Sequence, residues 1–334
     1  MIKLERQHLL DSFQRKVNYL RISITDKCNL RCRYCAPARA QAMREPQLLS
    51  FQEIYRLVRI AVDLGVTKVR LTGGEPLCRK GVGGLIGAIS ALPRIDDISV
   101  TTNATLLLAH RAVALKRSGL NRINISLDTL DREKYLRLTG ADRFDDVWSG
   151  LMTALQTGFS PIKINMVVMR GVNDDEIEAM ARLAVTYPFH VRFIEYMPIG
   201  TDPLQARGYF VPVAEIEARL RQMGRLMPVA SADDGGPARR FRFVDAPGEV
   251  GWIGSMSTHF CRTCNRIRLT ADGHLRACLL ADEQVNVVTP LRSGASDETI
   301  AACFRQAIRG KRRQHQMDFS RDRMLQTQMV SIGG

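Results

Sequence analysis

The chain has 334 residues, of which 45% are hydrophobic and 25% are charged, which excludes a disordered or collagen-like protein. Lysine and arginine outnumber aspartate and glutamate by 48 to 34, and the resulting net charge of +14 favours an anionic ligand. The sequence has no helix-turn-helix or zinc-finger pattern and only 6% aromatic residues, so we expect a phosphorylated small molecule rather than a nucleic acid.

The sequence shows no secretory or membrane-spanning segment. The residues after Met1 lack the apolar core of a signal peptide, and no stretch reaches the roughly 18 consecutive apolar residues that a bilayer span requires. We therefore expect a cytoplasmic protein. The chain has eight cysteines, and because a reducing compartment disfavours disulfides, their spacing predicts metal binding or catalysis.

Apolar, β-branched segments bounded by turn residues predict six strands. They are Val17–Ile24, Val66–Leu71, Ile98–Thr101, Arg122–Leu127, Ile162–Met169 and Val191–Tyr196. Segments with the helical period lie between them, after Ser50 and at Gly84–Leu92, Leu106–Arg117, Phe144–Thr157 and Asp174–Thr186. This alternation predicts parallel βαβ units, because parallel neighbours need a long crossover. Since a closed barrel has eight units, we expect an α/β fold built on an incomplete (β/α)6 TIM-type barrel.

The alternation stops near Pro198, and the remaining sequence predicts a smaller α+β region. Its expected elements are a helix near Val213–Met223, a turn-rich segment at Ser231–Ala238, short strands between Phe241 and Leu269, and a helix near Glu298–Arg313. We therefore predict two domains, residues 1–198 and residues 199–334, with the second packed over the mouth of the barrel.

Cys28, Cys32 and Cys35 form a CxxxCxxC motif directly after the first predicted strand. In βα architectures the chemistry lies at the C-terminal ends of the strands. Three neighbouring thiolates bind a soft metal, and a structural zinc ion would need a fourth ligand, either the distant Cys78 or a histidine. A 4Fe-4S cluster with three cysteines instead keeps one iron open for a ligand.

This motif resembles that of the radical S-adenosylmethionine (SAM) superfamily, in which CxxxCxxC holds a 4Fe-4S cluster whose open iron chelates SAM. The segment Gly73–Pro76, with the sequence GGEP after the second strand, strengthens the resemblance. The resemblance implies reductive cleavage of SAM to a 5'-deoxyadenosyl radical, so no residue is assigned as an acid or base. It also implies that Tyr34 contacts the adenine and that the GGEP segment contacts the methionine amino group, where glycine permits a close backbone approach.

A second trio consists of Cys261, Cys264 and Cys278, and the turn residues Asp272-Gly273 predict a hairpin that returns Cys278 to the CxxC pair. Taken alone, the trio either binds zinc with His259 or His274 or holds a second cluster with an open iron.

Two arginines follow the CxxC pair. Arg266 and Arg268 alternate along a predicted strand, so both side chains point to one face. There they either bind a triphosphate or face solvent.

The second trio lies in the segment CNRIRLTADGHLRACL, which is similar to the GTP 3',8-cyclase family. The resemblance covers nearly the whole chain and includes TDKCNLRC, TTN, SLD, RFIEYMP and the terminal Gly-Gly. It implies that the second 4Fe-4S cluster binds guanine through its open iron and that the deoxyadenosyl radical abstracts the 3' hydrogen of GTP. Attack of the carbon radical on C8 would give (8S)-3',8-cyclo-7,8-dihydroguanosine 5'-triphosphate, the first step of molybdenum cofactor biosynthesis.

Matched position by position, the resemblance assigns the contacts with both ligands. SAM would contact Tyr34, Gly74, Ser126 and Met197, and GTP would contact Arg21, Arg70, Thr102, Lys163, Arg266, Ile267 and Arg268. Arg192 is a further candidate. Because Lys163 and Arg192 lie inside apolar strand-like segments, where an unpaired charge is costly, they also imply an interior anion independently of the resemblance.

The end of the chain has an expected role too. The resemblance implies that Gly333 and Gly334 enter the barrel near the reactants, and that Arg321–Arg323 bring positive charge toward GTP or SAM. It further implies a homodimer, a reducing electron donor and a cyclic pyranopterin monophosphate synthase that receives the product.

Some positions depart from the usual pattern of the family. Ala36 stands where methionine is common, Ala104 stands where glycine is frequent, and Ala38-Arg39-Ala40 lacks the usual acidic residues. These departures bear on loop conformation and SAM affinity rather than on the reaction. Cys78 and Cys303 are expected to be packed cysteines.

Two other functions compete with this interpretation. A radical SAM maturase that modifies peptides would share the first trio and GGEP, but would usually carry more than three C-terminal cysteines. A zinc-bearing protein that binds nucleic acid would agree with the basic charge.

Overall fold

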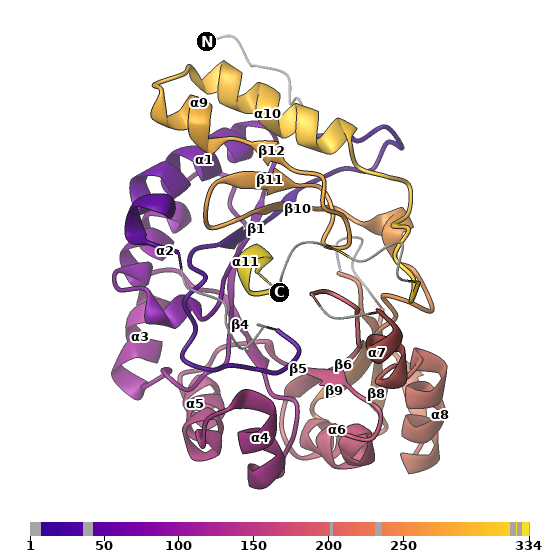
Figure 1. Cartoon of the computed structure of the whole chain (residues 1–334). Helices are drawn as coiled ribbons and strands as arrows, with labels where there is room; N and C mark the ends of the chain where they lie inside the picture. The colour runs from indigo at the N-terminus through magenta and orange to yellow at the C-terminus, as the bar shows by residue number, and fades with distance from the viewer. Residues whose placement is uncertain are drawn as a thin grey trace.

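The computed structural model describes residues 8–35, 43–200, 203–230, 236–320, 325 and 329–333. In this part of the chain, one 12-stranded sheet has the strand order β12-β11-β10-β1-β2-β3-β4-β5-β6-β9-β8-β7 (Figure 1). Six parallel neighbours follow one another along the chain: β1 (Tyr19–Ser23), β2 (Lys68–Thr72), β3 (Asp97–Thr102), β4 (Arg122–Ser126), β5 (Ile162–Val168) and β6 (Phe189–Glu195). They confirm the six predicted strands and the α/β fold.

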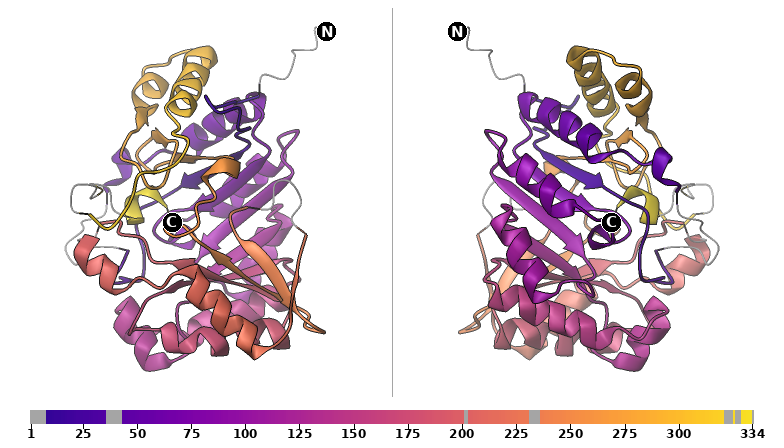
Figure 2. Two further views of the ribbon diagram at one scale, coloured as in Figure 1. Left: turned by 90° about the vertical axis from the view of Figure 1, so that its right-hand side faces the viewer. Right: turned by 90° about the vertical axis from the view of Figure 1, so that its left-hand side faces the viewer.

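Helices on the outside of the curved sheet connect these strands (Figures 1 and 2). The predicted helices are present as α1 (Phe51–Asp63), α2 (Val82–Ser90), α3 (Ala109–Arg117), α5 (Phe144–Gln156) and α6 (Ile177–Thr186). Helix α1 begins with a capping box, because Glu53 N donates to the Ser50 hydroxyl at 3.1 Å and Ser50 N donates to the Glu53 carboxylate at 2.6 Å. The sequence pattern misses α4 (Arg132–Thr139), in which only Tyr135, Leu138 and Thr139 are buried.

The C-terminal region extends the sheet at both edges. β10 (Arg266–Leu269) pairs in parallel with β1, and β9 (Glu249–Ile253) pairs in parallel with β6. Antiparallel strands lie beyond them: β11 (His274–Arg276) and β12 (Val285–Asn286) at one edge, and β8 (Arg239–Phe243) and β7 (Leu226–Pro228) at the other. The division at residue 198 stays a prediction, and strands from both sides of it share one sheet.

The remaining elements are mostly helical. They are α7 (Pro203–Gly208), α8 (Val213–Met223), α9 (Val288–Arg292), α10 (Asp297–Arg309), α11 (Met329–Ile332) and 3-10 helices at Glu45–Gln47, Pro76–Cys78, Asp174–Glu176 and Cys261–Thr263. Helix α8 has its predicted bounds, whereas α10 ends before the predicted Arg313. Of the turn-rich segment Ser231–Ala238, residues 231–235 lie outside the described ranges. Within those ranges, no helix combines the length and apolar character needed to cross a membrane.

Side chains alternate between two environments along the central strands. Ile164 in β5 and Leu20 and Ile22 in β1 are fully buried in the main hydrophobic core. Lys163 and Arg21, next to them in sequence, point to the opposite face and line an interior cavity. The apolar core therefore lies between the sheet and its helices, while the inner face of the sheet is polar.

A buried carboxylate joins the barrel to the C-terminal region. Glu195, at the end of β6, accepts hydrogen bonds from Val213 N at 2.9 Å, Met256 N at 2.7 Å and Ser257 N at 2.9 Å. Val213 begins α8, and the other two donors follow β9. One fully buried side chain therefore fixes both segments against β6.

Replacing this carboxylate should destabilise the fold. We expect Glu195→Ala to lower the free energy of unfolding by about 3 kcal/mol or more, because each buried donor left unpaired costs roughly 1–3 kcal/mol. Thermal and urea unfolding followed by circular dichroism measures the change. Glu133→Ala is the matched control, since the Glu133 side chain is 88% exposed. Equal melting temperatures for the two variants would show that Glu195 does not hold the segments together.

Candidate active site

The inner face of the sheet borders a cavity of about 640 Å³. Among the described residues, its lining contains more cations than carboxylates. The cations are Arg21, Lys68, Arg70, Arg122, Lys163, Arg192, Arg240, Arg266 and Arg268, and the carboxylates are Glu75, Asp96, Asp97 and Asp128. A cavity with this excess of positive charge favours an anionic ligand, as the net charge of the sequence predicts.

The cavity brings together most residues that the resemblance assigns to ligands. Its lining includes Tyr34, Gly74, Ser126, Met197, Arg21, Arg70, Thr102, Lys163, Arg266 and Arg268, as well as the further candidate Arg192. Ile267 is different, because its fully buried side chain belongs to the hydrophobic core on the other face of β10. Arg266 and Arg268 share one face, as their spacing predicts.

Two of the cations on the cavity wall have no counter-ion among the described residues. Neither Lys163 nor Arg192 has an ion pair or hydrogen bond with the described part of the chain. Burial and the neighbouring Arg192 lower the pKa of Lys163 to about 5, and burial together with Arg70 and Arg122 lowers the pKa of Arg192 to about 9. A bound anion would favour the charged form of both side chains.

The first cysteine trio follows β1, and all three side chains line the cavity. The Cys28 sulfur accepts hydrogen bonds from Leu30 N at 3.4 Å and from Asn103 Nδ2 at 3.9 Å. Burial raises the pKa of Cys28 to about 11, and burial together with Cys28 raises the pKa of Cys35 to about 12. Three thiolates in this setting need a cation between them, so the donor set fits an iron-sulfur cluster.

Asp128 holds Tyr34 beside the first trio. The Tyr34 hydroxyl donates a hydrogen bond to Asp128 Oδ2 at 2.6 Å, and Val167 N donates to the other carboxylate oxygen at 2.8 Å. Asn173 Nδ2 donates to the Asp128 carbonyl at 2.8 Å. Sequence reasoning identified Tyr34 but not its partner, although the position of Asp128 just after β4 was an available signal.

The two glycines of GGEP pack two loops together. A Cβ atom on Gly73 would lie 2.3 Å from the carbonyl oxygen of Thr25, and one on Gly74 would lie 2.5 Å from that of Lys27. Gly74 N donates to Thr25 O at 2.7 Å. Glycine is therefore required here for contact between the loops, in addition to the close approach to a ligand that the sequence predicts.

Glu75 of the same motif organises the loop after β3. It accepts hydrogen bonds from the Thr102 hydroxyl at 2.7 Å, Asn103 N at 2.7 Å and Leu77 N at 2.9 Å. The Thr102 hydroxyl therefore donates to the protein itself. Ala104 follows with φ of +61°, in the left-handed region, which explains why glycine is frequent at this position.

The second trio lies near the N-terminal ends of β1 and β10, whereas the first trio follows the C-terminal end of β1. Tyr19 is in register with Arg266, so the N-terminal ends of β1 and β10 lie together. Cys264 precedes β10, and Cys278 follows β11, which is antiparallel to β10. This confirms the predicted hairpin and places both cysteines at the N-terminal end of β1, whereas the first trio follows its C-terminal end.

The thiols of the second trio line a separate pocket of about 40 Å³. Although burial by itself raises the pKa of Cys264, the nearby Arg266 and Lys311 cations lower it to about 6. A thiolate near cations is typical of reactive or metal-binding cysteines. His274, one of the two predicted zinc ligands, has its Nδ1 atom 3.2 Å from the Asp272 carboxylate.

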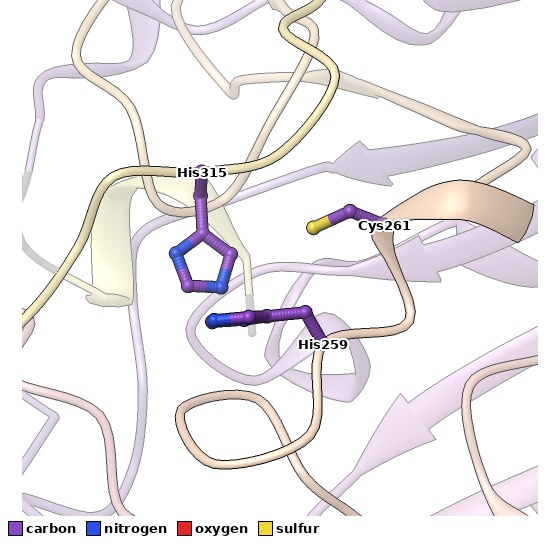
Figure 3. Close-up of side chains that lie close together, drawn as sticks. All are labelled: His259, Cys261 and His315. Atoms are coloured by element: carbon purple, nitrogen blue, oxygen red, sulfur yellow. The ribbon is translucent and has the colours of Figure 1, made fainter.

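Two histidines lie beside Cys261 (Figure 3). The ligand atoms of His259, Cys261 and His315 all lie within 4.8 Å of one another. However, His315 Nε2 lies 2.8 Å from the Ser255 carbonyl, and Met317 N donates to His315 Nδ1 at 3.3 Å. Both ring nitrogens are therefore already hydrogen-bonded, and a metal ion would have to displace one of these bonds.

Two family models match the chain, and each matched range contains one of the cysteine trios. The model of the radical SAM superfamily matches residues 22–184, and the model named Molybdenum Cofactor Synthesis C matches residues 189–317. The GTP 3',8-cyclase of Pelotomaculum thermopropionicum is 48% identical over 327 residues, which cover 97% of this chain and 99% of the relative. That of Moorella thermoacetica is 47% identical over 309 residues, which cover 92% of this chain and 95% of the relative.

The chain belongs to the GTP 3',8-cyclase family. It is a radical SAM enzyme that cyclises GTP in molybdenum cofactor biosynthesis. Streptococcus suis SuiB bound to S-adenosylmethionine has a TM-score of 0.58 and 18% identity, and the alignment covers 89% of this chain and 66% of SuiB. At this identity the similarity concerns the fold alone, so it does not favour a peptide-modifying maturase.

The C-terminal segment of this enzyme lies inside the curve of the sheet (Figure 1). Gly333 is buried, and its carbonyl accepts a hydrogen bond from Arg268 Nη1 at 2.5 Å. A Cβ atom on Gly333 would lie 2.6 Å from Thr72 Cγ2 and 3.2 Å from Ser23 Cβ, so a larger residue would collide with the strand ends. Gly334 and Arg321–Arg323 lie outside the described residues.

Other predicted positions are less informative. Cys303 packs against the main core, as expected, and Cys78 is partly buried with its sulfur 3.8 Å from Asn29 Oδ1. Ala36 and Ala38-Arg39-Ala40 lie outside the described residues.

The ammonium group of Lys163 should make the stability of the ligand-free enzyme depend on pH. Folding lowers the pKa of Lys163 from 10.5 to about 5, so the unfolded chain binds a proton there that the folded chain does not. Between pH about 5 and 10.5, folding therefore requires Lys163 to lose its proton, which lowers the free energy of unfolding. This penalty disappears as the pH rises toward 10.5. We therefore expect Lys163→Met to raise the melting temperature at neutral pH, with the gain shrinking at alkaline pH.

Thermal unfolding of the ligand-free enzyme at several pH values measures this effect. Lys80→Met removes the same charge from an exposed position and serves as the control. A Lys163→Met variant that is no more stable than Lys80→Met at neutral pH would contradict the prediction.

Proposed function

We propose that the enzyme binds one 4Fe-4S cluster in each cysteine trio and holds SAM and GTP in the cavity between them. The observation that supports this arrangement is the register of β1 and β10, because the first trio follows β1 and lines the cation-lined cavity, while Cys264 at the other end of these strands precedes the cavity residues Arg266 and Arg268. When bound, the first cluster supplies the electron that cleaves SAM, and the second offers an open iron to guanine. The side chains of the cavity position the two ligands so that the 5'-deoxyadenosyl radical reaches the 3' hydrogen of GTP.

SAM would lie next to the first trio. Tyr34, oriented by its hydrogen bond to Asp128, would contact the adenine, while Gly74, Ser126 and Met197 complete the site. The GGEP loop is held against residues 25–27 because Gly74 N and Glu75 N donate to the carbonyls of Thr25 and Lys27, so the backbone that would meet the methionine moiety is fixed before SAM binds. This preorganisation reduces the entropy cost of binding.

GTP would occupy the cationic part of the cavity. Arg21, Arg70, Lys163, Arg266 and Arg268 would bind its triphosphate, with Arg192 as a further contact and Thr102 at the edge of the site. Ile267 would contribute only its backbone, because its side chain lies in the core on the other face of β10. Charge-assisted hydrogen bonds from arginine suit phosphate oxygens. The cyclised product keeps the triphosphate, so the same contacts would retain the nucleotide throughout the reaction.

The proposal extends to the cellular context. We propose a cytoplasmic enzyme that functions as a homodimer, receives electrons from a reducing donor and passes its product to a cyclic pyranopterin monophosphate synthase.

The alternative at the second trio is a zinc site with His259, which the short distances around Cys261 favour. Metal analysis after anaerobic purification separates the two possibilities. About eight irons per chain supports two clusters. Stoichiometric zinc with about four irons would overturn the second cluster.

The two trios should differ in the defect that their loss causes. Cys28→Ser should abolish reductive cleavage of SAM, whereas Cys261→Ser should leave some SAM cleavage while GTP binding and cyclised product are lost. Anaerobic assays of 5'-deoxyadenosine and of nucleotide product by mass spectrometry, with a GTP binding titration, measure these effects. Normal SAM cleavage in the first variant, or full GTP affinity in the second, would refute the corresponding assignment.

The paired arginines of β10 should recognise the triphosphate. We expect Arg266→Ala/Arg268→Ala to weaken GTP binding by about two to four orders of magnitude, because each charge-assisted hydrogen bond contributes roughly 1.5–3 kcal/mol. Guanosine binding, measured in parallel, should change much less. Equal losses for the two ligands would place these arginines away from the triphosphate.

The C-terminal glycines should be needed for turnover rather than for folding. Gly333 packs against Thr72 and Ser23 and accepts a hydrogen bond from the cavity residue Arg268, so deletion of Gly333-Gly334 should leave cluster content and melting temperature intact while strongly reducing cyclised product. A synthetic peptide matching the last dozen or so residues, added in excess, should partly restore activity by mass action. Unchanged turnover after the deletion would show that this end of the chain has no part in the reaction.

A further inference from the structure

Lys311 is a buried cation that connects both arms of the hairpin carrying the second trio. Only 4% of its surface is exposed, and its ammonium group donates hydrogen bonds to Arg266 O at 2.8 Å and Ala277 O at 2.6 Å. Arg266 follows Cys264 closely, and Ala277 directly precedes Cys278. One side chain therefore ties together the two backbone segments that present these thiols.

The charge of Lys311 has no carboxylate partner within the described part of the chain. Both of its hydrogen-bond acceptors are neutral carbonyls. Glu283, which lines the same small pocket, forms an ion pair with Arg312 instead. A buried ammonium group without a counter-ion is costly, so its position beside the three thiols indicates that these thiols supply the compensating negative charge.

A neighbouring arginine provides a contrast. Arg15 donates to Cys261 O at 2.5 Å and to Arg313 O at 3.0 Å, so it ties the third cysteine to the chain segment that contains Lys311. However, the buried carboxylate of Asp11 pairs with Arg15 and neutralises it. Unlike Arg15, Lys311 therefore keeps its charge for the thiolates, as does the cavity residue Arg266 beside Cys264.

We propose that Lys311 is the positioning residue and fixed counter-charge of the second cluster. Its hydrogen bonds set the separation of the two hairpin arms, and its charge offsets that of the three thiolates. This inference rests on the second cluster proposed above. Since net charge and hydrogen bonding tune the potential and retention of such clusters, loss of Lys311 should make reduction harder and cluster release faster.

The experiment isolates the second site in a parent variant, Cys28→Ser/Cys32→Ser/Cys35→Ser. In this background, Lys311→Met removes both the hydrogen bonds and the charge, and Lys311→Gln keeps a donor without the charge. Arg313→Met is the matched control, because it removes one positive charge from an exposed position of the same segment. Iron content, the release of iron to a chelator and a redox titration followed by electron paramagnetic resonance are measured anaerobically.

We expect the reduction potential to become more negative in both Lys311 variants, and iron release to be about tenfold to a hundredfold faster in Lys311→Met. Arg313→Met should match the parent. If circular dichroism shows that Lys311→Met does not fold, the change in the reduction potential of Lys311→Gln tests the proposal instead. A potential and release rate equal to the parent would overturn the role of Lys311, whereas a parent without a cluster would overturn the proposed second cluster and this inference with it.

Discussion

Positive charge on the inner face of the sheet is the constraint on which the rest of the structure depends. Each central strand places apolar side chains toward the helices and polar side chains toward the cavity, so the core and the ligand site share the same strands. Lys163 and Arg192 reduce the stability of the ligand-free fold unless an anion is bound. The apolar layer between the sheet and the helices offsets this cost, and the preference for a phosphorylated ligand is thus built into the strands themselves.

Buried carboxylates hold the loops in place at the C-terminal ends of the strands. Glu75, Asp128 and Glu195 each follow or end a parallel strand and accept hydrogen bonds from backbone amides of neighbouring strands and loops. Because a buried carboxylate needs several donors, each one fixes the loops around it. The loops that carry the cysteines and the SAM contacts therefore have defined positions, although they contain few apolar residues.

The sequence was sufficient to predict the strands whose polar and apolar residues alternate. It was also sufficient to identify Lys163 as a candidate ligand contact, because a charge within an apolar segment is unusual. It could not show that β9 and β10 flank the six central strands, because pairing over such a sequence separation leaves no local pattern. The role of Asp128 as the partner of Tyr34 depends on the same long-range geometry. Lys311 lies in a run of basic residues and is distinguished from Arg312 and Arg313 only by its burial.

The pairing of β1 with β10 also has a consequence for folding in the cell. Leu20 and Ile267 lie in register, yet their strands come from opposite ends of the chain. During synthesis, β1 therefore lacks its β10 neighbour until most of the chain has been made. An open sheet edge of this kind can pair with other chains. A chain that ends before β10 would expose this edge permanently. We therefore regard protection of β1 as a second role of the segment that carries the second trio, one that matters before any ligand is bound.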